Sequence, residues 1–202
     1  MKQDEGKYRP LSYFQLMEVT LRELLVEKGV LTGDQIEAEV ENMRSRTPER
    51  GARVVAKAWT DSDYRNRLVL NGTKACEELG LDVPALKLVV VENTPQVHNA
   101  IVCTLCSCYP RMLLGIPPDW YKSRNYRSRM VREPRAVLAE FGLVIREETQ
   151  IQVHDSTADM RYLVLPMRPQ GTEGWSEERL AALVTRDCMI GVALPDSPGK
   201  TA

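Results

Sequence analysis

Three cysteines fall within six residues of this chain, and no other feature constrains its fold as strongly. Residues 103 to 108 read Cys-Thr-Leu-Cys-Ser-Cys, whereas the whole chain of 202 residues contains five cysteines. A disulfide framework spreads its cysteines along the chain, so a group this tight is more typical of a metal or redox site. The short apolar run Ala-Ile-Val at residues 100 to 102 predicts a strand directly before the cluster. We therefore expect a thiol site in a loop where a strand ends.

The remaining sequence predicts an α+β fold with a separable helical start. Apolar residues from Leu11 to Leu25 recur at helical spacing, and Thr32 with Gln35 fits a capping box that opens a second helix. We therefore expect a helical N-terminal arm at residues 1–50 and a second domain at residues 51–202. In that domain we predict helices at residues 54–59, 61–79 (with Asp61 as N-cap), 117–121, 133–142 and from 176, and strands at residues 86–91, 100–102, 151–154 and 161–167.

Composition and charge exclude several classes of partner. The chain carries 27 basic and 28 acidic residues, which gives a net charge of -1 and no global attraction to nucleic acid or anionic membranes. The first residues lack the apolar core of a signal peptide, and no apolar run approaches the roughly 20 residues of a membrane span. Residues 111 to 135 are locally basic but contain no groove-reading motif, so interface pairing or solvated helix faces explain them better. We expect a cytoplasmic protein that binds neither membranes nor nucleic acid.

Several familiar thiol sites fit the cluster poorly. A structural zinc site needs four ligands, usually in two pairs, but Cys76 and Cys188 are isolated. A zinc site made of the three clustered thiolates and His98 nevertheless stays open. A thioredoxin-like pair would open a helix after a strand, and a third thiol two residues further on would interfere with redox exchange. An iron–sulfur cluster requires a fourth nearby cysteine, which the sequence lacks.

A single ion bound by residues 103 to 108, an arrangement that we call the claw, fits this spacing better. If Cys106 and Cys108 bind through sulfur, the peptide nitrogens of Ser107 and Cys108 lie between them and complete a plane once they are deprotonated. Cys103 then approaches along the axis, which gives three sulfurs, two amide nitrogens and one vacant position. Such strongly donating ligands suit trivalent cobalt or iron better than zinc. Because a vacant position on a Lewis acid can take water or substrate, the arrangement suggests catalysis.

The cluster and several further segments resemble the α subunit of nitrile hydratase. The metal motif at residues 102 to 109 reads Val-Cys-Thr-Leu-Cys-Ser-Cys-Tyr, and its likeness to the family is highly specific. Other segments that resemble the family lie at residues 114–123, 126–129, 132–135, 155–157, 161–162, 171–176 and 187–192. The resemblance implies a layered α-β-β-α catalytic domain at residues 51–202. It also implies that residues 1–50 form an arm that contacts a β subunit.

The resemblance implies a role for each residue of the claw. Cys103 would be the axial thiolate, Cys106 would be oxidised to a sulfinic acid and Cys108 to a sulfenic acid. Ser107 and Cys108 would supply backbone nitrogens to the metal. The catalytic group would be Cys106, Ser107 and Cys108. Thr104 stands where iron-type members have serine, so a non-corrin Co(III) ion is expected rather than Fe(III).

In this family the metal polarises a nitrile, water or the sulfenate oxygen attacks its carbon, and an amide is released. The resemblance therefore implies a hydro-lyase that acts on a small-molecule nitrile. Arginines of the β subunit hold the oxidised sulfurs in the family, and that subunit is one chain or is split into two. A metallochaperone or activator protein is also expected. The alternatives are the catalytic γ subunit of thiocyanate hydrolase, which uses the same claw, and a non-catalytic zinc or disulfide module.

Three positions depart from the family's pattern, and one of them is Asp159, which stands where the family usually has glutamate. Arg111-Met112 follows the Tyr-Pro pair after the claw, where members often carry Trp-Pro, so the pocket or its entrance is expected to differ. His98 is followed by Asn99, where cobalt-type members tend to have a second histidine. A structural, hydrogen-bonded His98 is therefore the preferred interpretation.

Overall fold

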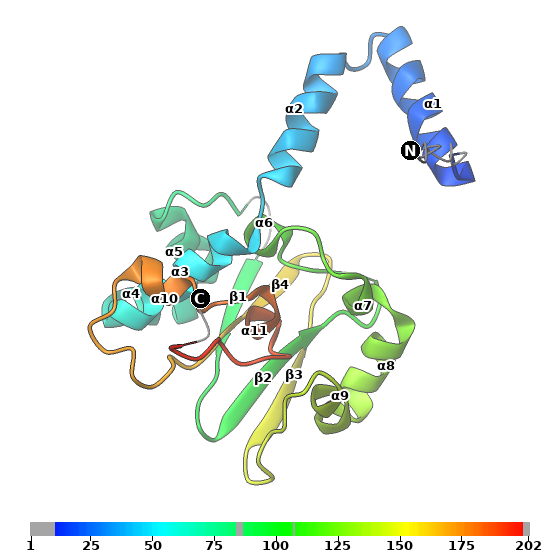
Figure 1. The fold of residues 1–202 in the computed structure, drawn as a ribbon. Helices are drawn as coiled ribbons and strands as arrows, with labels where there is room; N and C mark the ends of the chain where they lie inside the picture. The colour runs from blue at the N-terminus through cyan, green and yellow to red at the C-terminus, as the bar shows by residue number, and fades with distance from the viewer. Residues whose placement is uncertain (1–10, 84–86, 107, 200–202) are drawn as a thin grey trace, which may run out of the picture. The chain divides into compact units, whose positions relative to one another are not determined.

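The computed structural model of this chain describes residues 11–83, 87–106 and 108–199 (Figure 1). The chain separates into two compact units, Met1–Arg44 and Ser45–Ala202. The larger unit begins just ahead of helix α3, which starts at Pro48. This unit carries all four strands of the described residues and also the cysteine cluster.

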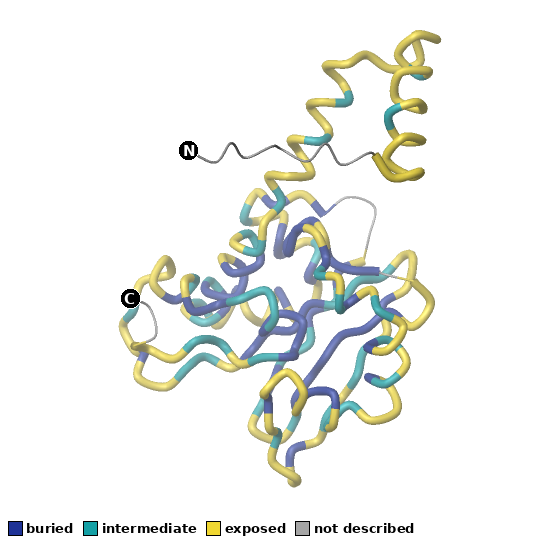
Figure 2. The backbone as a smooth tube through the Cα atoms, turned by 45° about the vertical axis from the view of Figure 1, so that its right-hand side comes forward, coloured by how far each residue is buried: buried dark blue, intermediate teal, exposed yellow. Residues whose placement is uncertain are grey.

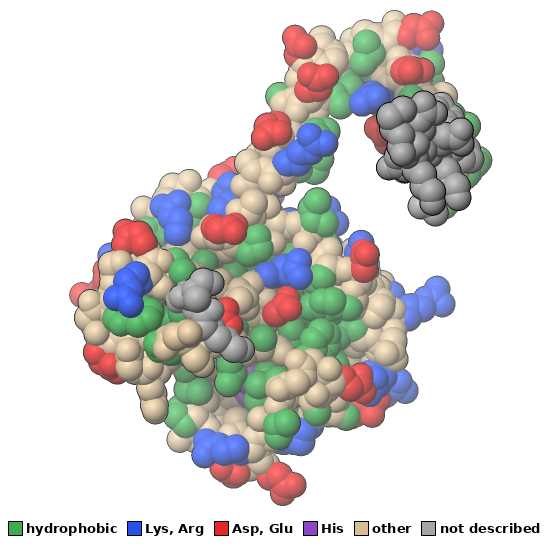
Figure 3. Space-filling model, in the orientation of Figure 1, with side chains coloured by type: hydrophobic (Ala, Val, Ile, Leu, Met, Phe, Trp, Pro, Cys, Tyr) green, Lys and Arg blue, Asp and Glu red, His purple; other side chains and the backbone are tan. Residues whose placement is uncertain are grey.

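The smaller unit contains two helices that bury none of their residues. Helix α1 spans Tyr13–Glu27 and α2 spans Gly33–Arg44. The predicted capping box is confirmed, because the Thr32 N–H donates to Gln35 Oε1 at 2.9 Å and the Gln35 N–H donates to Thr32 Oγ1 at 3.2 Å. Apolar side chains such as Phe14, which is 80% exposed, lie uncovered among charged ones (Figure 2, Figure 3). Helices with an unburied apolar stripe are suited to pack against another surface.

The strands of the larger unit form two parallel pairs. Strand β1 (Lys87–Glu92) pairs with β4 (Met160–Leu165), and β2 (Val97–Val102) pairs with β3 (Gln150–Asp155). The four predicted strands are confirmed, although their ends are shifted. Val102 lies opposite Asp155, so the last residues of β2 and β3 are neighbours. Because parallel strands end at the same edge of a sheet, the loops that follow these two strands start side by side.

Helices lie on both sides of the paired strands, which confirms the predicted α+β class (Figure 1). One side has α3 (Pro48–Thr60), α4 (Ser62–Leu70), α5 (Gly72–Glu78) and α10 (Glu177–Ala181). The other side has α7 (Asp119–Lys122), α8 (Arg124–Arg132) and α9 (Pro134–Glu140). Two short helices, α6 (Arg111–Leu114) and α11 (Arg186–Ile190), complete the unit. This order of helices, two strand pairs and helices agrees with the expected α-β-β-α layers.

Within the described ranges, no helix has the length and apolarity needed to cross a membrane.

One hydrophobic core joins both strand pairs to the helices and extends to the cysteine cluster. Its members include Val55 of α3, Val90 of β1 and Met189 of α11. Ile101, Val102 and Cys103 are each 0% exposed. Full burial of a side chain such as Ile101 stabilises the fold by about 1.5–3 kcal/mol. The backbone is therefore fixed by packing up to the first cysteine.

The helix predicted at residues 61–79 is wrong as a single element. Asp61 is the N-cap as predicted, because its Oδ1 accepts from the Tyr64 N–H at 2.9 Å. The helix then ends, and Asn71 caps a new one by accepting from the Lys74 N–H at 3.1 Å. A Cβ at Gly72 would lie 2.7 Å from the carbonyl oxygen of Leu88, so the break brings the chain against strand β1. The two helices are thus separated by a local cap at Asn71, and Gly72 lies against a strand that is distant in sequence.

Candidate metal centre

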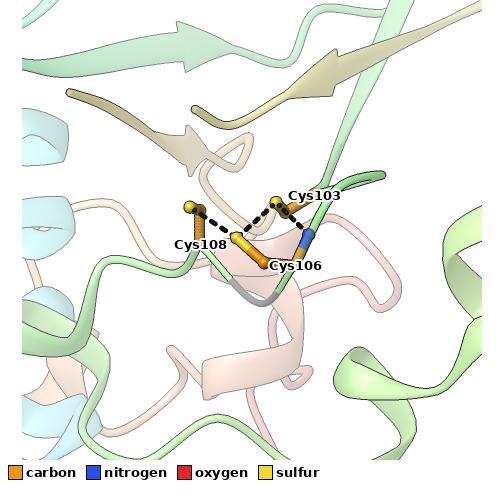
Figure 4. A group of neighbouring side chains, drawn as sticks. All are labelled: Cys103, Cys106 and Cys108. Carbon is orange, nitrogen blue, oxygen red and sulfur yellow. Dashed lines mark hydrogen bonds between the residues drawn. The ribbon is translucent and has the colours of Figure 1, made fainter. Parts of the chain in front are cut away.

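The cysteine cluster lies in the loop that follows β2, at the strand end that the sequence predicts. Cys103 directly follows this strand, and the three sulfurs point toward one another (Figure 4). Cys103 Sγ lies 3.4 Å from Cys106 Sγ, which lies 3.1 Å from Cys108 Sγ. All three sulfurs lie within 4.8 Å of one another, and no other such group of His, Cys, Asp or Glu is found in the described residues. Ser107, which is expected to contribute a backbone nitrogen, lies outside those residues.

The sulfur separations fit one bound ion better than a disulfide or a tetrahedral zinc site. A disulfide joins its sulfurs at about 2.05 Å. With metal–sulfur bonds of about 2.3 Å, adjacent ligands of an octahedral ion lie about 3.3 Å apart, and those of a tetrahedral ion about 3.8 Å apart. The observed separations of 3.1 and 3.4 Å are closer to the octahedral value. The three cysteines therefore fit a transition ion that accepts soft thiolate ligands.

Burial keeps the Cys108 thiol protonated in the absence of a cation. Cys103 and Cys108 are 0% and 9% exposed, whereas Cys106 is exposed. Burial, together with the two neighbouring thiols, raises the pKa of Cys108 to about 12, and the positive charge of Arg161 opposes this shift. Cys108 is therefore a protonated thiol at neutral pH unless a cation replaces its proton. Thiolate ligation by a multivalent ion makes that replacement and so couples metal binding to proton release.

The first half of the loop is held from two sides. The Thr104 N–H donates to Asp155 Oδ1 at 2.9 Å, and the Thr104 hydroxyl donates to Asp155 Oδ2 at 2.5 Å. Asp155 is the last residue of β3, so the parallel pairing of β2 and β3 brings its carboxylate to the loop. Arg127 of α8 donates from Nη1 to the carbonyl oxygen of Cys106 at 3.0 Å. Hydrogen bonds to charged groups are roughly twice as strong as neutral ones, so the turn is well fixed.

Two tyrosines bind the backbone on either side of the cluster. The Tyr121 hydroxyl donates to the carbonyl oxygen of Cys108 at 2.9 Å, and the Tyr126 hydroxyl donates to that of Ile101 at 2.8 Å. Trp120 packs edge-on against Tyr126, with ring centroids 4.9 Å apart. Burial raises the pKa of both tyrosines well above the usual range, so both remain protonated donors. Tyr121 therefore holds the loop at Cys108, whereas Tyr126 contacts the strand that precedes the loop.

The sequence predicts the thiols of this site but not the residues that hold their loop. Asp155 could have been found, because a residue that ends a strand parallel to β2 must lie near the loop after β2. No comparable signal points to Tyr121 or Arg127, since their contacts arise from the packing of α7 and α8. Arg161 donates to the backbone carbonyl oxygens of Thr157 and Ala158.

His98 is a structural residue and not a fourth metal ligand. Its side chain is 4% exposed, and Nε2–H donates to the carbonyl oxygen of Gly191 at 2.8 Å. The other ring nitrogen, Nδ1, accepts from the Asn93 amide at 3.4 Å. Burial lowers the pKa of His98, which favours this neutral form. Because both ring nitrogens are engaged, the structure does not form the zinc site of three cysteines and His98.

Comparison with known proteins gives the family. The family model described as "Nitrile hydratase, alpha chain" matches residues 12–193. The chain belongs to the nitrile hydratase alpha-chain family. The nitrile hydratase subunit alpha of Rhodococcus sp is 52% identical over 181 residues, which cover 88% of this chain and 91% of that protein. The cobalt-containing nitrile hydratase subunit alpha of Pseudonocardia thermophila is 51% identical over 85% of this chain and 86% of its own length. The resemblance inferred from the sequence is thereby confirmed.

Solved structures similar to this chain include proteins with different metals. A thiocyanate hydrolase with partially modified cobalt centres superposes with a TM-score of 0.88 at 43% identity, covering 94% of this chain and 93% of that one. A double mutant of the iron-type nitrile hydratase of Comamonas testosteroni gives a TM-score of 0.87 at 44% identity, with 94% of each chain covered. The thiocyanate hydrolase subunit gamma of Thiobacillus thioparus is 44% identical over 95% of this chain and 83% of its own length. The nitrile hydratase alpha-chain fold is thus shared by cobalt and iron proteins.

Proposed function

We propose that this chain is the α subunit of a cobalt nitrile hydratase, which hydrates a nitrile to the corresponding amide. The observation that carries the proposal is the convergence of three cysteine sulfurs, 3.1 and 3.4 Å apart, in a chain of this family. A cobalt-containing relative at 51% identity supports cobalt over iron, and so does Thr104 in the metal motif. A non-corrin Co(III) ion held here would act as a Lewis acid that polarises the carbon–nitrogen triple bond.

Each residue of the claw then has a defined task. Cys103 would bind as a thiolate, and the backbone nitrogens of Ser107 and Cys108 would complete the donor set. Dioxygen or a peroxide would accept the electrons that convert Cys106 to a sulfinate and Cys108 to a sulfenate. The added oxygens weaken electron donation by the sulfurs and provide hydrogen-bond acceptors. Cys108, as the sulfenate, would supply the oxygen that attacks the nitrile carbon or would take a proton from an attacking water.

A β subunit would complete this site. Cys106 is exposed and Leu105 is 86% exposed, so the loop presents one side of the cluster to a partner. Arginines of the β subunit would pair with the oxidised sulfurs through charge-assisted hydrogen bonds. Residues 1–50 would form an arm that covers its apolar side chains on the same subunit, whether that subunit is one chain or two. A metallochaperone would load the ion, and the protein would act in the cytoplasm.

Metal analysis and peptide mass test this proposal together. The chain is purified with its β subunit, and the peptide that contains residues 103 to 108 is measured by mass spectrometry. The proposal expects cobalt, two added oxygens on Cys106 and one on Cys108, together with amide formation from a panel of aliphatic, aromatic and nucleoside nitriles. Zinc in the protein with no added oxygen on this peptide would contradict the proposal and favour a non-catalytic module.

Thiocyanate hydrolysis is the second candidate function. The γ-subunit relative matches 95% of this chain, compared with 88% for the Rhodococcus relative, although its identity is 44% and not 52%. Both reactions begin with addition of water to a carbon bonded to nitrogen by a triple bond, so one claw suits either. Thiocyanate and the nitrile panel are therefore assayed in parallel. Ammonia release from thiocyanate with no amide from any nitrile would favour this second candidate.

A further inference from the structure

The last cysteine of the claw lies in a stretch with no regular secondary structure of its own. Cys103 directly follows β2, and the Cys106 carbonyl is held by Arg127. Cys108 lies between these contacts and α6, which begins only at Arg111. Neither a strand ladder nor a helix fixes its backbone. Some other contact must therefore hold Cys108 so that its sulfur stays 3.1 Å from that of Cys106.

Tyr121 supplies that contact through its hydroxyl and its ring. Its hydroxyl donates to the Cys108 carbonyl oxygen at 2.9 Å, and its ring packs edge-on against Tyr109, with ring centroids 5.1 Å apart. The hydrogen bond fixes the orientation of the peptide that follows Cys108, and the ring contact fixes the next residue. Together they set the direction in which the Cys108 side chain leaves the backbone.

Tyr121 is itself rigid, as a positioning group must be. It is 0% exposed, and its ring packs against those of Trp120 and Tyr126, with centroids 6.0 and 5.7 Å away. Close-packed aromatic rings have few alternative rotamers, so the hydroxyl cannot follow the loop if the loop moves. The position of the Cys108 carbonyl oxygen is therefore set by the packed core and not by the loop.

We propose that Tyr121 is a positioning residue of the metal centre, which holds Cys108 in its binding geometry through the Cys108 carbonyl. The inference rests on the proposed function in that it assumes Cys108 to be a metal ligand. Tyr121 does not touch the metal or the substrate. Residues that orient metal ligands commonly change metal affinity or activity by about 10- to 100-fold when they are replaced.

Tyr126 offers a matched control in the same aromatic cluster. It is 4% exposed, and its hydroxyl donates at 2.8 Å to a buried carbonyl oxygen, as that of Tyr121 does. Its acceptor, however, is Ile101 of β2, and the residues on either side of Ile101 lie in the strand that pairs with β3. Tyr126→Phe therefore removes the same chemical group from a similar environment without loosening a cysteine.

The test compares Tyr121→Phe and Tyr126→Phe in the metal-loaded complex with the β subunit. The readouts are the rate of metal loss to a chelator, the sulfur-to-metal charge-transfer absorption, and kcat and KM separately. For Tyr121→Phe we expect metal loss faster by about tenfold, a shifted absorption band and a lower kcat with little change in KM. Tyr126→Phe should match the parent protein in all three. A donor restored by site-specific 4-aminophenylalanine at position 121 should recover slow metal loss.

The outcomes separate this inference from the proposed function. If Tyr121→Phe retains metal and absorption like the parent, or if both variants change equally, Tyr121 has no positioning role. If the parent complex contains no cobalt and converts no nitrile, the proposed function fails instead. In that case Cd²⁺ titration of the reduced proteins, followed by thiolate-to-cadmium absorption, still compares the two variants. Equal Cd²⁺ affinity in both would overturn the inference.

Discussion

Replacement of Gly191 by alanine tests how firmly α11 is docked against the strand that leads to the cluster. Gly191 follows α11 with φ +90°, a conformation that residues with a Cβ rarely adopt. A Cβ at this position would overlap the carbonyl oxygen of Asn99 and lie 2.8 Å from Ala100 Cα, both in β2. The Gly191 carbonyl also accepts the buried hydrogen bond from His98 at 2.8 Å. A backbone shift that relieves the overlap therefore weakens that bond.

The expected loss of stability has two parts. The left-handed conformation costs about 1–2 kcal/mol for a residue with a Cβ. Overpacking against β2 adds about 1–3 kcal/mol. The total of about 2–5 kcal/mol is a large share of the roughly 5–15 kcal/mol that stabilises a typical domain. At about 2–4 °C per kcal/mol, Gly191→Ala should lower Tm by roughly 4–20 °C.

Gly142→Ala is the matched control for this prediction. Gly142 follows α9 with φ +80°, but nothing lies within 4 Å of a Cβ there. It should therefore lose only the conformational part, about 1–2 kcal/mol. Thermal unfolding of the parent and both variants, followed by circular dichroism at one scan rate, gives the comparison. Equal losses of Tm in the two variants would refute the close docking of α11 on β2.

Three further predictions concern the site and its surroundings. Cys103→Ala removes the thiol proposed as the axial ligand, so metal content by mass spectrometry and turnover should both fall to background. Full activity would refute the ligand assignment. Asp155→Asn weakens both hydrogen bonds from Thr104, so the unfolding free energy measured by urea titration should fall by about 1 kcal/mol. Chelators should also remove metal faster from this variant. An unchanged rate of metal loss would contradict the role of Asp155 in holding the loop. Burial lowers the pKa of His98, so below about pH 6.5 the unfolded chain takes up a proton that the folded chain refuses. The unfolding free energy should therefore decrease as the pH falls below that value, and a flat profile between about pH 7.5 and 5.5 would contradict this.

Features that depend on residues close in sequence could be predicted. The capping box of Thr32 and the N-cap Asp61 each use a partner three residues away, and both are present. The cysteine cluster follows the same logic, because its three sulfurs come from residues 103 to 108 and converge in one loop. Burial at the end of β2 also follows from the apolar run that precedes the cluster. The grouping of the three sulfurs could therefore be predicted from the sequence.

Features that depend on distant residues were not predictable in this way. The helix break at Asn71 serves the close approach of Gly72 to Leu88 in β1. The hydroxyl of Tyr121 donates to the Cys108 carbonyl oxygen only because α7 packs next to the loop. Local propensity records neither contact. Such contacts decide how rigidly the ligands are held, so the sequence predicts which residues gather and the fold determines how precisely they are placed.

Burial differs among the three cysteines of the cluster. Cys103 and Cys108 are 0% and 9% exposed, and the chain's own core holds the backbone at both. Cys106 is exposed at the turn between them, where Arg127 holds its carbonyl oxygen and the Cys106 N–H donates to Cys103 Sγ at 3.2 Å. An oxidised Cys106 would therefore project its oxygens out of the chain, where water competes for every hydrogen bond. Only a second surface that excludes water can make those oxygens strong acceptors, because hydrogen bonds to charge are stronger in a low dielectric. Under the proposed function, this chain would supply the metal ligands, and the β subunit would exclude water from the oxidised sulfurs.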